Sequence, residues 1–252
     1  MAKETYAISI GVLYPDVLSE AGDKANICAL TKRLTDRNIQ ANVVNIPFDS
    51  PSLSPFFTSI DALYIGGGSE KTLLTVLEKL RNDHIILEKY VNEFFPIFAF
   101  SGSFPIFGHH LSFDGESRAG LGIVGMEMLA SNMKAVGNVK AEVSFGGNPI
   151  KIYGFENHTG RVNIFQKSPF ARLIVGKGNN TSLEEGITYK DFYGTWLTGP
   201  LLPQNPELTD RLLDICIQHK YNKKISLSAL DDTIEKNAVA EIEKKFEKKK
   251  GK

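Results

Sequence analysis

The chain has 252 residues, of which 42% are hydrophobic and 23% are charged, and 29 basic residues balance 29 acidic ones. Such a composition is typical of one large globular domain, and the balanced charge argues against a protein that binds nucleic acid. The two cysteines, Cys28 and Cys216, share no short spacing, so they cannot form a tetrahedral zinc site by themselves and indicate a reducing compartment. No segment approaches the roughly 18 consecutive apolar residues that a spanning helix needs. We therefore expect a cytoplasmic protein without membrane insertion.

The first half of the chain alternates between short apolar runs and segments with helical periodicity. Within residues 24–37, for example, Ile27, Leu30 and Leu34 recur at helical spacing. Strands are expected at residues 6–13, 41–46, 62–65 and 97–100, and helices at residues 24–37, 71–80 and 84–94. This alternation predicts an α/β fold with a mostly parallel central sheet and helices on both of its faces.

The second half is rich in short strands that Gly, Asn and Pro turns separate. We interpret these strands as a β-rich extension of the sheet with hairpins at its edge, formed by residues 140–145, 150–155, 173–176 and 192–197. A helix is expected at residues 206–221 and a weaker one at 230–246, whose Lys and Glu residues indicate a solvated face or a frayed tail. We therefore expect one domain over residues 1–220, followed by a C-terminal helix and basic tail over residues 221–252.

A sharp turn follows the fourth expected strand, where Ser101 and Gly102 lead into a segment with a helical pattern. A strand-to-helix turn projects one side chain above the sheet edge and aims the next backbone N–H groups at the same place. Acyl-transfer enzymes carry nucleophiles on such turns, because nearby amides stabilise an oxyanion. Ser101 is not part of a complete G-x-S-x-G motif, so taken alone this signal is weak, and an ordinary turn between strand and helix has the same pattern.

Three glycines, Gly66, Gly67 and Gly68, end the third expected strand. At the carboxyl edge of a parallel sheet, glycine lets backbone amides approach a ligand closely. The run matches neither G-x-G-x-x-G nor a P-loop, so phosphate binding is not expected. It predicts either a turn that binds an oxyanion or a carboxylate, or a plain tight turn.

None of the five histidines offers Ser101 an evident base. If the turn continues as a helix, His109 and His110 lie about 12 Å along its axis, at about 1.5 Å per residue. His158 belongs to a dense polar cluster, which would either serve a site or hold a loop. Both cysteines fall on apolar faces of expected helices and are expected in the core. These residues show no metal-ligating pattern, and neither a metal nor a cofactor is expected.

Several glycine-rich and polar stretches, taken together and in order, resemble one known family. They are residues 66–69, 101–102, 120–123, 154–161, 176–180, 185–186 and 194–206. They resemble the cobyric-acid-synthase-like class I glutamine amidotransferases and, within that family, the amidotransferase subunit of lipid II isoglutaminyl synthase. The likeness covers roughly residues 6 to 220, and the stretches 154–161 and 194–206 are the specific ones. It implies a flavodoxin-like class I amidotransferase domain, in agreement with the alternating strands and helices.

The resemblance also implies a chemistry and a partner. In that family a Cys on the turn attacks the side-chain amide of glutamine, and a His of a G-T-x-L-H-G-P motif relays the proton. The ammonia passes to a Mur-ligase-like subunit, which amidates the D-glutamate α-carboxyl of the peptidoglycan precursor, so a heterodimer is expected. By the same resemblance, Gly67 and Gly102 would donate to an oxyanion of the bound glutamine.

This sequence departs from the family pattern at the reacting positions. Ser101 stands where the family has the nucleophilic Cys, and Thr198 where it has the His that acts as general base. Lys134 aligns with an Arg that would hold the substrate carboxylate, and a Lys keeps the charge but not the bidentate fork. A Ser hydroxyl needs an adjacent base, and a Thr hydroxyl accepts no proton usefully near pH 7. We therefore expect an amidotransferase fold that is retained without its glutaminase activity.

Two alternatives remain open at this point. The first is an active serine variant, a glutaminase or amidase that uses Ser101 with another base, such as His158 or a group from the partner. The second is a regulatory subunit that binds glutamine or a related small molecule around Gly67, Ser101 and Lys134. In each case the partner is a protein or a small molecule, not a nucleic acid.

Overall fold

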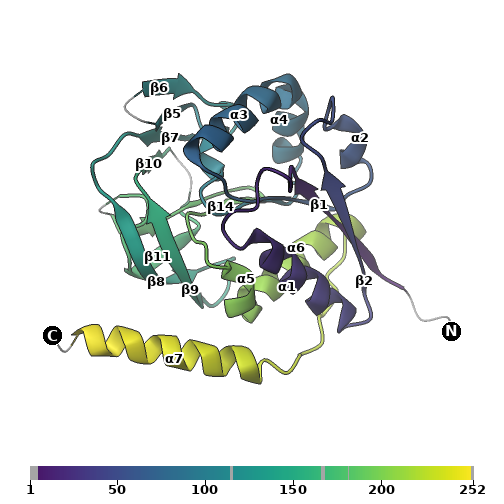
Figure 1. Cartoon of the computed structure of the whole chain (residues 1–252). Coiled ribbons are helices and arrows are strands. Elements are labelled where there is room, and N and C mark those ends of the chain that lie inside the picture. Colours follow the sequence, from purple (N-terminus) through teal and green to yellow (C-terminus); the bar gives the residue numbers. More distant parts are fainter. Residues whose placement is uncertain (1–4, 114–115, 166–167, 181, 251–252) are drawn as a thin grey trace.

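The computed structural model describes residues 5–113, 116–165, 168–180 and 182–250, with only the helical backbone for 247–250. Its centre is a six-stranded sheet in the order β13-β14-β4-β3-β1-β2 (Figure 1). The strands are β1 (Ala7–Leu13), β2 (Gln40–Ile46), β3 (Ala62–Ile65), β4 (Ile97–Ala99), β13 (Ile187–Tyr189) and β14 (Phe192–Gly194). All neighbours are parallel except the β13–β14 hairpin at one edge. The run β2-β1-β3-β4-β14 is the flavodoxin-like strand order, which confirms the predicted fold class.

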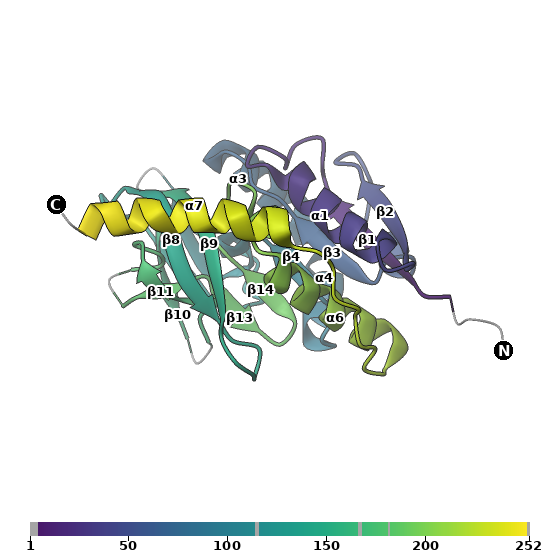
Figure 2. The same cartoon turned by 90° about the horizontal axis from the view of Figure 1, so that it is seen from below.

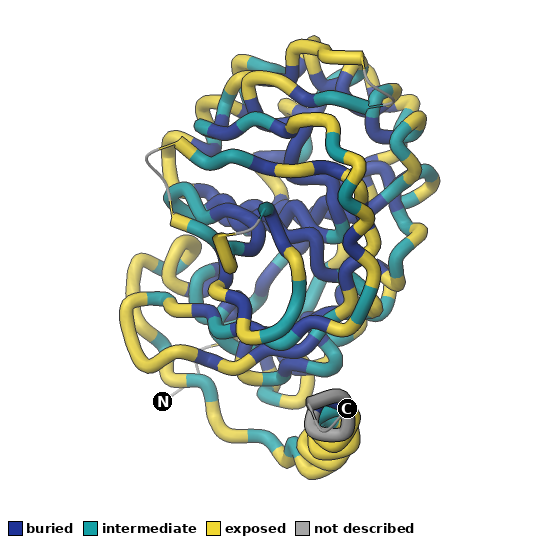
Figure 3. The backbone as a smooth tube through the Cα atoms, turned by 90° about the vertical axis from the view of Figure 1, so that its left-hand side faces the viewer, coloured by how far each residue is buried: buried dark blue, intermediate teal, exposed yellow. Residues whose placement is uncertain are grey.

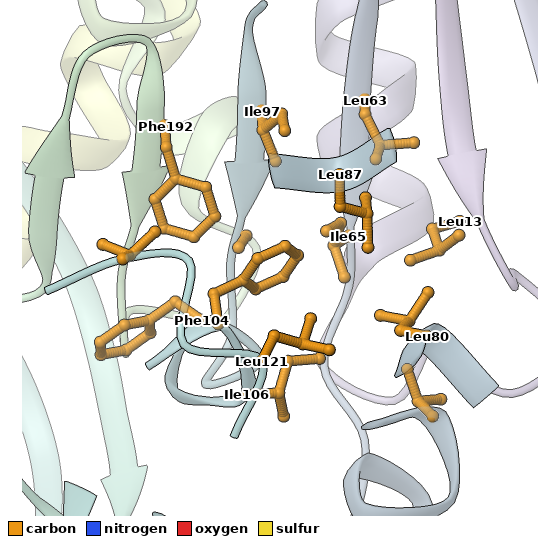
Figure 4. Close-up of a cluster of buried hydrophobic side chains, with 14 of the residues drawn as sticks. Leu13, Leu63, Ile65, Leu80, Leu87, Ile97, Phe104, Ile106, Leu121 and Phe192 are labelled. Atoms are coloured by element: carbon orange, nitrogen blue, oxygen red, sulfur yellow. The ribbon is translucent and has the colours of Figure 1, made fainter. Parts of the chain in front are cut away.

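Two hydrophobic clusters cover the two faces of this sheet. Alternate residues of β3 point to opposite faces: Leu63 and Ile65 belong to the first cluster, and Ala62 and Tyr64 to the second. Side chains of α3 (Glu70–Leu80), α4 (His84–Asn92) and the short α2 (Ser54–Phe57) pack into the first cluster, part of which Figure 4 shows. The second cluster takes side chains from α1 (Asp23–Thr35), α5 (Leu201–Gln204) and α6 (Pro206–Tyr221). Both faces are therefore buried, as a parallel sheet requires.

Most of the second half does not extend the central sheet, so the predicted β-rich extension is wrong in part. Only β13 and β14 join the sheet; the other strands form two separate four-stranded sheets. One contains β5 (His110–Phe113), β6 (Glu116–Ala119), β7 (Met126–Leu129) and β10 (Arg161–Ile164). The other contains β8 (Ala135–Val143), β9 (Ile150–His158), β11 (Ala171–Val175) and β12 (Glu184–Glu185). The alternating pattern predicts strands, but it does not say which strand edges pair.

The turn after β4 leads into a short 3-10 helix, η2 (Phe104–Phe107), and not into the predicted longer helix. Gly108 adopts an extended conformation and ends η2. His110 then begins β5, so the distance expected for His109 and His110 along a helix axis does not apply.

The two cysteines differ in their environment. Cys28 is exposed, which contradicts the expected core position, because α1 buries Asn26, Leu30 and Leu34 on the side away from it. Cys216 is buried on α6, as predicted.

The last helix, α7 (Thr233–Lys250), lies beside β8 and β9 and is exposed along most of its length (Figures 2 and 3). Glu243 nevertheless forms an ion pair with Lys140 of β8 at 2.7 Å, and the ring of Phe246 is buried. Ahead of the helix, Asp232 pairs with Arg33 of α1 at 2.6 Å. Among the described residues, no helix has both the length and the apolar character for crossing a membrane.

Candidate functional site

The turn after β4 holds Ser101 in a left-handed backbone conformation. Its φ is 56°, and that of Gly102 is 85°. This region is costly for a residue with a side chain and is found at turns, at helix ends and at strained functional sites. The conformation is that of a nucleophile elbow, which presents one side chain at the carboxyl edge of a parallel sheet. The structure therefore places Ser101 as a nucleophile would be placed.

The glycine run after β3 passes directly beside this turn. A Cβ on Gly67 would lie 2.6 Å from the backbone oxygen of Ser101 and 2.7 Å from its Cβ. A Cβ on Gly66 would lie 2.6 Å from the backbone oxygen of Leu18. Real Cβ atoms do not come this close to other atoms. Gly67 can therefore lie against Ser101, and Gly66 against Leu18, only because glycine has no side chain.

A buried carboxylate, Asp23 at the start of α1, connects these segments. Its Oδ1 accepts hydrogen bonds from the Tyr64 hydroxyl at 2.6 Å and from the Ser101 hydroxyl at 3.3 Å. Its Oδ2 accepts from the backbone N–H of Gly67 at 3.1 Å and of Ala21 at 3.3 Å. Sequence reasoning missed this residue, because an Asp in the first turn of a helix ordinarily serves only the helix dipole.

The two predicted oxyanion donors are both occupied by acceptors of the protein itself. The N–H of Gly67 donates to Asp23, and the N–H of Gly102 donates to the backbone oxygen of Thr195 at 3.1 Å. An oxyanion hole needs N–H groups that are aimed at the position of the developing charge. In this arrangement neither of these two N–H groups is available for that role.

Thr198 lies in the same cleft as Ser101, so the structure brings the two reacting positions together. The Thr198 hydroxyl donates to the backbone oxygen of Ala21 at 2.8 Å. Its backbone N–H and oxygen pair with Phe155 of β9 at 2.9 and 3.1 Å. The hydroxyl therefore binds the loop that precedes α1 and offers no proton acceptor comparable to an imidazole.

The cleft has a volume of about 440 Å³ and lies where the central sheet meets the two smaller sheets. Its lining includes Glu20 and Glu70, the aromatic residues Phe113, Phe155 and Trp196, and the predicted site residues Ser101, Gly102 and Thr198. Gly67 is buried next to the cleft. Lys134 is exposed and does not line it. The structure therefore brings together four of the five predicted site residues, and Lys134 is the exception.

His158 is held by one hydrogen bond and by an aromatic ring. Its imidazole stacks on the indole of Trp196, with ring centres 4.1 Å apart and an angle of 7° between the planes. Its Nδ1 lies 3.2 Å from the backbone oxygen of Gly160, and its Nε2 lies 3.8 Å from Oε2 of Glu156. Although burial acts against ionisation, the pKa of Glu156 is lowered by His158 and by backbone N–H groups that donate to it. Nε2 is buried and has no hydrogen-bond partner among the described residues, so the imidazole is held by Nδ1 and by its stacking on Trp196.

A second buried carboxyl group, Glu185, supports the segment that carries Trp196. It accepts hydrogen bonds from the Thr195 hydroxyl at 2.9 Å and from the Trp196 N–H at 2.7 Å. Complete burial raises the pKa of Glu185 to about 8, although these two donors oppose the shift. Sequence reasoning noted Glu185 only as part of a family stretch, since nothing local shows that its side chain points inward.

The described part of the chain contains no group of three or more His, Cys, Asp or Glu side chains that could hold a metal ion. The polar groups around Ser101 are instead hydroxyls, carboxylates and backbone amides. Such groups are suited to binding a small polar molecule.

Two solved structures show the same fold. PurLQS from Thermotoga maritima matches with a TM-score of 0.54 and 13% identity, over 87% of this chain and 100% of that chain. The glutaminase domain of Trypanosoma brucei CTPS, with bound acivicin, matches with a TM-score of 0.55 and 10% identity, over 88% of this chain and 96% of that chain.

Sequence comparisons identify nearer relatives. The chain is 32% identical over 207 residues to the lipid II isoglutaminyl synthase (glutamine-hydrolyzing) subunit GatD of Staphylococcus aureus, covering 81% of this chain and 82% of that protein. It is 27% identical over 242 residues to the subunit of the same name from Streptococcus pneumoniae, covering 94% and 90%. The model of the CobB/CobQ-like glutamine amidotransferase domain matches residues 9–206, a range that includes the turn at Ser101 and the cleft around it. The chain belongs to the CobB/CobQ-like glutamine amidotransferase family.

Proposed function

We propose that this chain is a GatD-like subunit of lipid II amidation that has lost its own glutaminase activity. The family and the names of the two relatives support the role in lipid II amidation. The loss of glutaminase activity rests on one observation: the nucleophile elbow carries a hydroxyl, that of Ser101, bound to the Asp23 carboxylate.

A hydroxyl in this position is a weak nucleophile. Among the described residues no imidazole forms a hydrogen bond with Ser101: its hydroxyl binds Asp23, and Nδ1 of His158 lies against the backbone oxygen of Gly160. In a well-studied enzyme with a nucleophile and a base, removing either one alone costs about 10⁶ in kcat, and the losses do not add. The occupied N–H groups of Gly67 and Gly102 remove stabilisation of the oxyanion as well.

The proposed partner is a Mur-ligase-like subunit in a heterodimer. Both relatives are named as subunits of a synthase, which supports a second chain. A subunit without turnover would retain its fold in order to stabilise or complete that partner. Co-expression followed by size-exclusion chromatography tests this part: we expect a stable one-to-one complex. A chain that stays monomeric in the presence of the partner would contradict it.

The loss of activity is tested by measuring ammonia release from glutamine by the chain in complex with its Mur-ligase-like partner. We expect release at the level of the Ser101→Ala variant, which cannot use the side chain at all. The Staphylococcus aureus relative with its own partner is the positive control for the assay. Release that exceeds background and disappears in Ser101→Ala would refute the proposal.

The bond between Ser101 and Asp23 also favours one specific second candidate, a serine-dependent amidase with Asp23 as the base. In this candidate Asp23, and not the expected His158, is the base, because the imidazole already faces Gly160 and Glu156. It requires that Asp23→Asn abolish any measured hydrolysis as completely as Ser101→Ala does. Hydrolysis that survives Asp23→Asn would eliminate this second candidate.

A further inference from the structure

The neutral net charge of the chain is the sum of two parts with opposite charge. Residues 244–252 contain six lysines and one glutamate, so this segment carries five net positive charges. Residues 1–243 contain 23 Lys and Arg against 28 Asp and Glu, which leaves five net negative charges. Attraction to a polyanion is therefore confined to the C-terminal end, because the remainder of the chain repels one.

This basic segment begins on α7, whose opposite face packs on the body of the protein. Val239 and Ile242 are partly buried, and Phe246 is buried. Between them, Glu243 pairs with Lys140 of β8 at 2.7 Å. These four residues of α7 recur at helical spacing and define its inward face. The protein itself uses the apolar face of α7, so contact with any other surface falls to the charged face.

The outward face of α7 presents lysines to solvent. Lys244 and Lys245 are both exposed. Among the described residues neither forms an ion pair with the body, and Lys244 pairs only with Glu241 of the same helix, at 2.6 Å. Such an exposed pair is worth little and exchanges readily for another anion. The end of α7 also extends past β8 and β9 to the side of the molecule (Figures 1 and 2), so these lysines are open to a large partner.

Basic residues near the end of a helix also have a plain structural use. They stabilise the negative end of the helix dipole, which is equivalent to about half an elementary charge and acts over the last turn. Lys244 and Lys245 lie one turn before the last turn of α7, and the whole segment carries five net charges. The dipole therefore accounts for only part of this basic segment.

We propose that the C-terminal end of α7 binds the surface of an anionic lipid bilayer, by electrostatic attraction and without insertion. Clusters of about four to eight basic residues on a helix attract anionic headgroups in this way. The proposal rests on the proposed function, because a lipid substrate such as lipid II resides in a bilayer. A chain held at the bilayer surface keeps its complex beside that substrate. The net negative charge of residues 1–243 orients the molecule with this end toward the lipid.

Vesicle sedimentation with the full-length chain, without a partner, tests the proposal. Vesicles of equal parts phosphatidylglycerol and phosphatidylcholine are compared with vesicles of phosphatidylcholine alone. We expect the chain to sediment with the anionic vesicles in about 0.1 M salt and to be released in about 1 M salt, because the Debye length shortens from about 10 Å to about 3 Å. No sedimentation with the anionic vesicles, or equal sedimentation with the neutral ones, would overturn the proposal.

Two double variants locate the contact. Lys244→Gln with Lys245→Gln should weaken binding to the anionic vesicles about 25-fold, at about fivefold for each lysine near the surface. Lys24→Gln with Lys89→Gln removes two exposed lysines of α1 and α4 instead. This matched control should bind as the unaltered chain does. Equal affinities of the two double variants, at unchanged melting temperatures, would refute a contact at the end of α7.

A duplex DNA oligonucleotide, titrated in parallel, distinguishes a lipid surface from a nucleic acid. We expect the anionic vesicles to bind the chain more tightly than DNA does at an equal concentration of negative charge. Binding to DNA without sedimentation of the chain with vesicles would assign the basic segment to a nucleic acid and overturn the proposal.

The sedimentation uses neither glutamine nor the partner, so its result is independent of the tests of the proposed function. Sedimentation with anionic vesicles together with glutamine hydrolysis that depends on Ser101 would uphold the lipid contact and refute the loss of activity. No sedimentation, combined with a stable complex and no hydrolysis, would refute the lipid contact alone.

Discussion

Ser101 and Asp23 together determine what the cleft can do. A hydroxyl stays neutral and donates to a carboxylate, so the pair is stable as it stands. A thiolate in the same place would face the negative charge of Asp23, which disfavours ionisation of a thiol. Ser101 and Asp23 therefore form a hydrogen bond between a neutral donor and a charged acceptor.

The size of the residue at position 67 is tightly limited at this site. In Gly67→Ala the new Cβ would lie 2.6 Å from the Ser101 backbone oxygen, so β3 and the turn after β4 must separate. We expect a loss of about 1–3 kcal/mol in the free energy of unfolding, the usual cost of overpacking, measured by chemical denaturation. Gly147→Ala is the control, because a Cβ there meets nothing within 4 Å. Equal stability of the two variants would contradict the close approach.

Glu185 predicts a pH dependence of stability. Its pKa is raised to about 8 in the folded chain, so the folded state holds a proton that the unfolded state releases near the ordinary Glu value. The contribution of Glu185 to stability is therefore lost progressively as the pH rises from about 4.5 to about 8.

The measurement is the melting temperature of the chain and of Glu185→Gln between pH 5 and 8. We expect the melting temperature of Glu185→Gln to fall less with rising pH than that of the unaltered chain, because the amide does not titrate. The melting temperature of the neighbouring variant Glu184→Gln should fall with rising pH as much as that of the unaltered chain. Parallel curves for Glu185→Gln and the unaltered chain would show that Glu185 is ionised throughout.

Among the elements, α7 is the one attached mainly by polar contacts. Glu243 binds Lys140 at 2.7 Å and also accepts from the Tyr153 hydroxyl. The hydrogen bond to Lys140, followed by that from Tyr153, holds the pKa of Glu243 below its usual range. The expected division of the chain at residue 220 stays a prediction, although α7 and its preceding segment touch α1 and β8.

Glu243→Gln should release α7 locally. The pair is partly exposed, with side chains 17% and 31% accessible, so its loss is worth at most about 1 kcal/mol. We expect faster amide hydrogen exchange in residues 233–246 with little change in the melting temperature. Glu241→Gln is the control, because its partner Lys244 lies on the same helix. Unchanged exchange in Glu243→Gln would mean that contacts other than this ion pair hold the helix.

At the scale of the whole molecule, the two hydrophobic clusters share one central sheet. Ile65 of β3 belongs to the first cluster and Ile8 of β1 to the second, and both are fully buried. Because β1 and β3 are hydrogen-bonded neighbours, loss of one cluster removes the support of the other. The domain should therefore unfold as one cooperative unit.

Ile65→Val and Ile8→Val test this cooperativity. Each substitution should lower the free energy of unfolding by about 0.5–1.5 kcal/mol. Each should shift one single unfolding transition, seen both by circular dichroism and by Trp196 fluorescence. Their effects should add in the double variant, since they lie on opposite faces of the sheet. Two separate transitions, with each variant shifting only one, would show that the clusters unfold independently.

The sequence by itself determined the four strands and the three longer helices of residues 6–99, since hydrophobic periodicity is local and β3 was predicted at the residues where it occurs. It did not predict the short α2. It also identified the family, because family membership depends on which residue stands at each position. Only the tertiary structure decided which strands of the second half pair, because alternation does not select a partner edge.

The tertiary structure alone also decided the chemistry inside the cleft. Asp23 and Ser101 are 78 positions apart, and neither the spacing nor the residue types indicate that they meet. The direction of each donor, toward Asp23, Thr195 or Ala21, is likewise set by backbone approach across β3, β4 and the loop before α1. Hydrogen bonds depend on distance and angle between atoms, which the fold fixes and a linear pattern of residues does not.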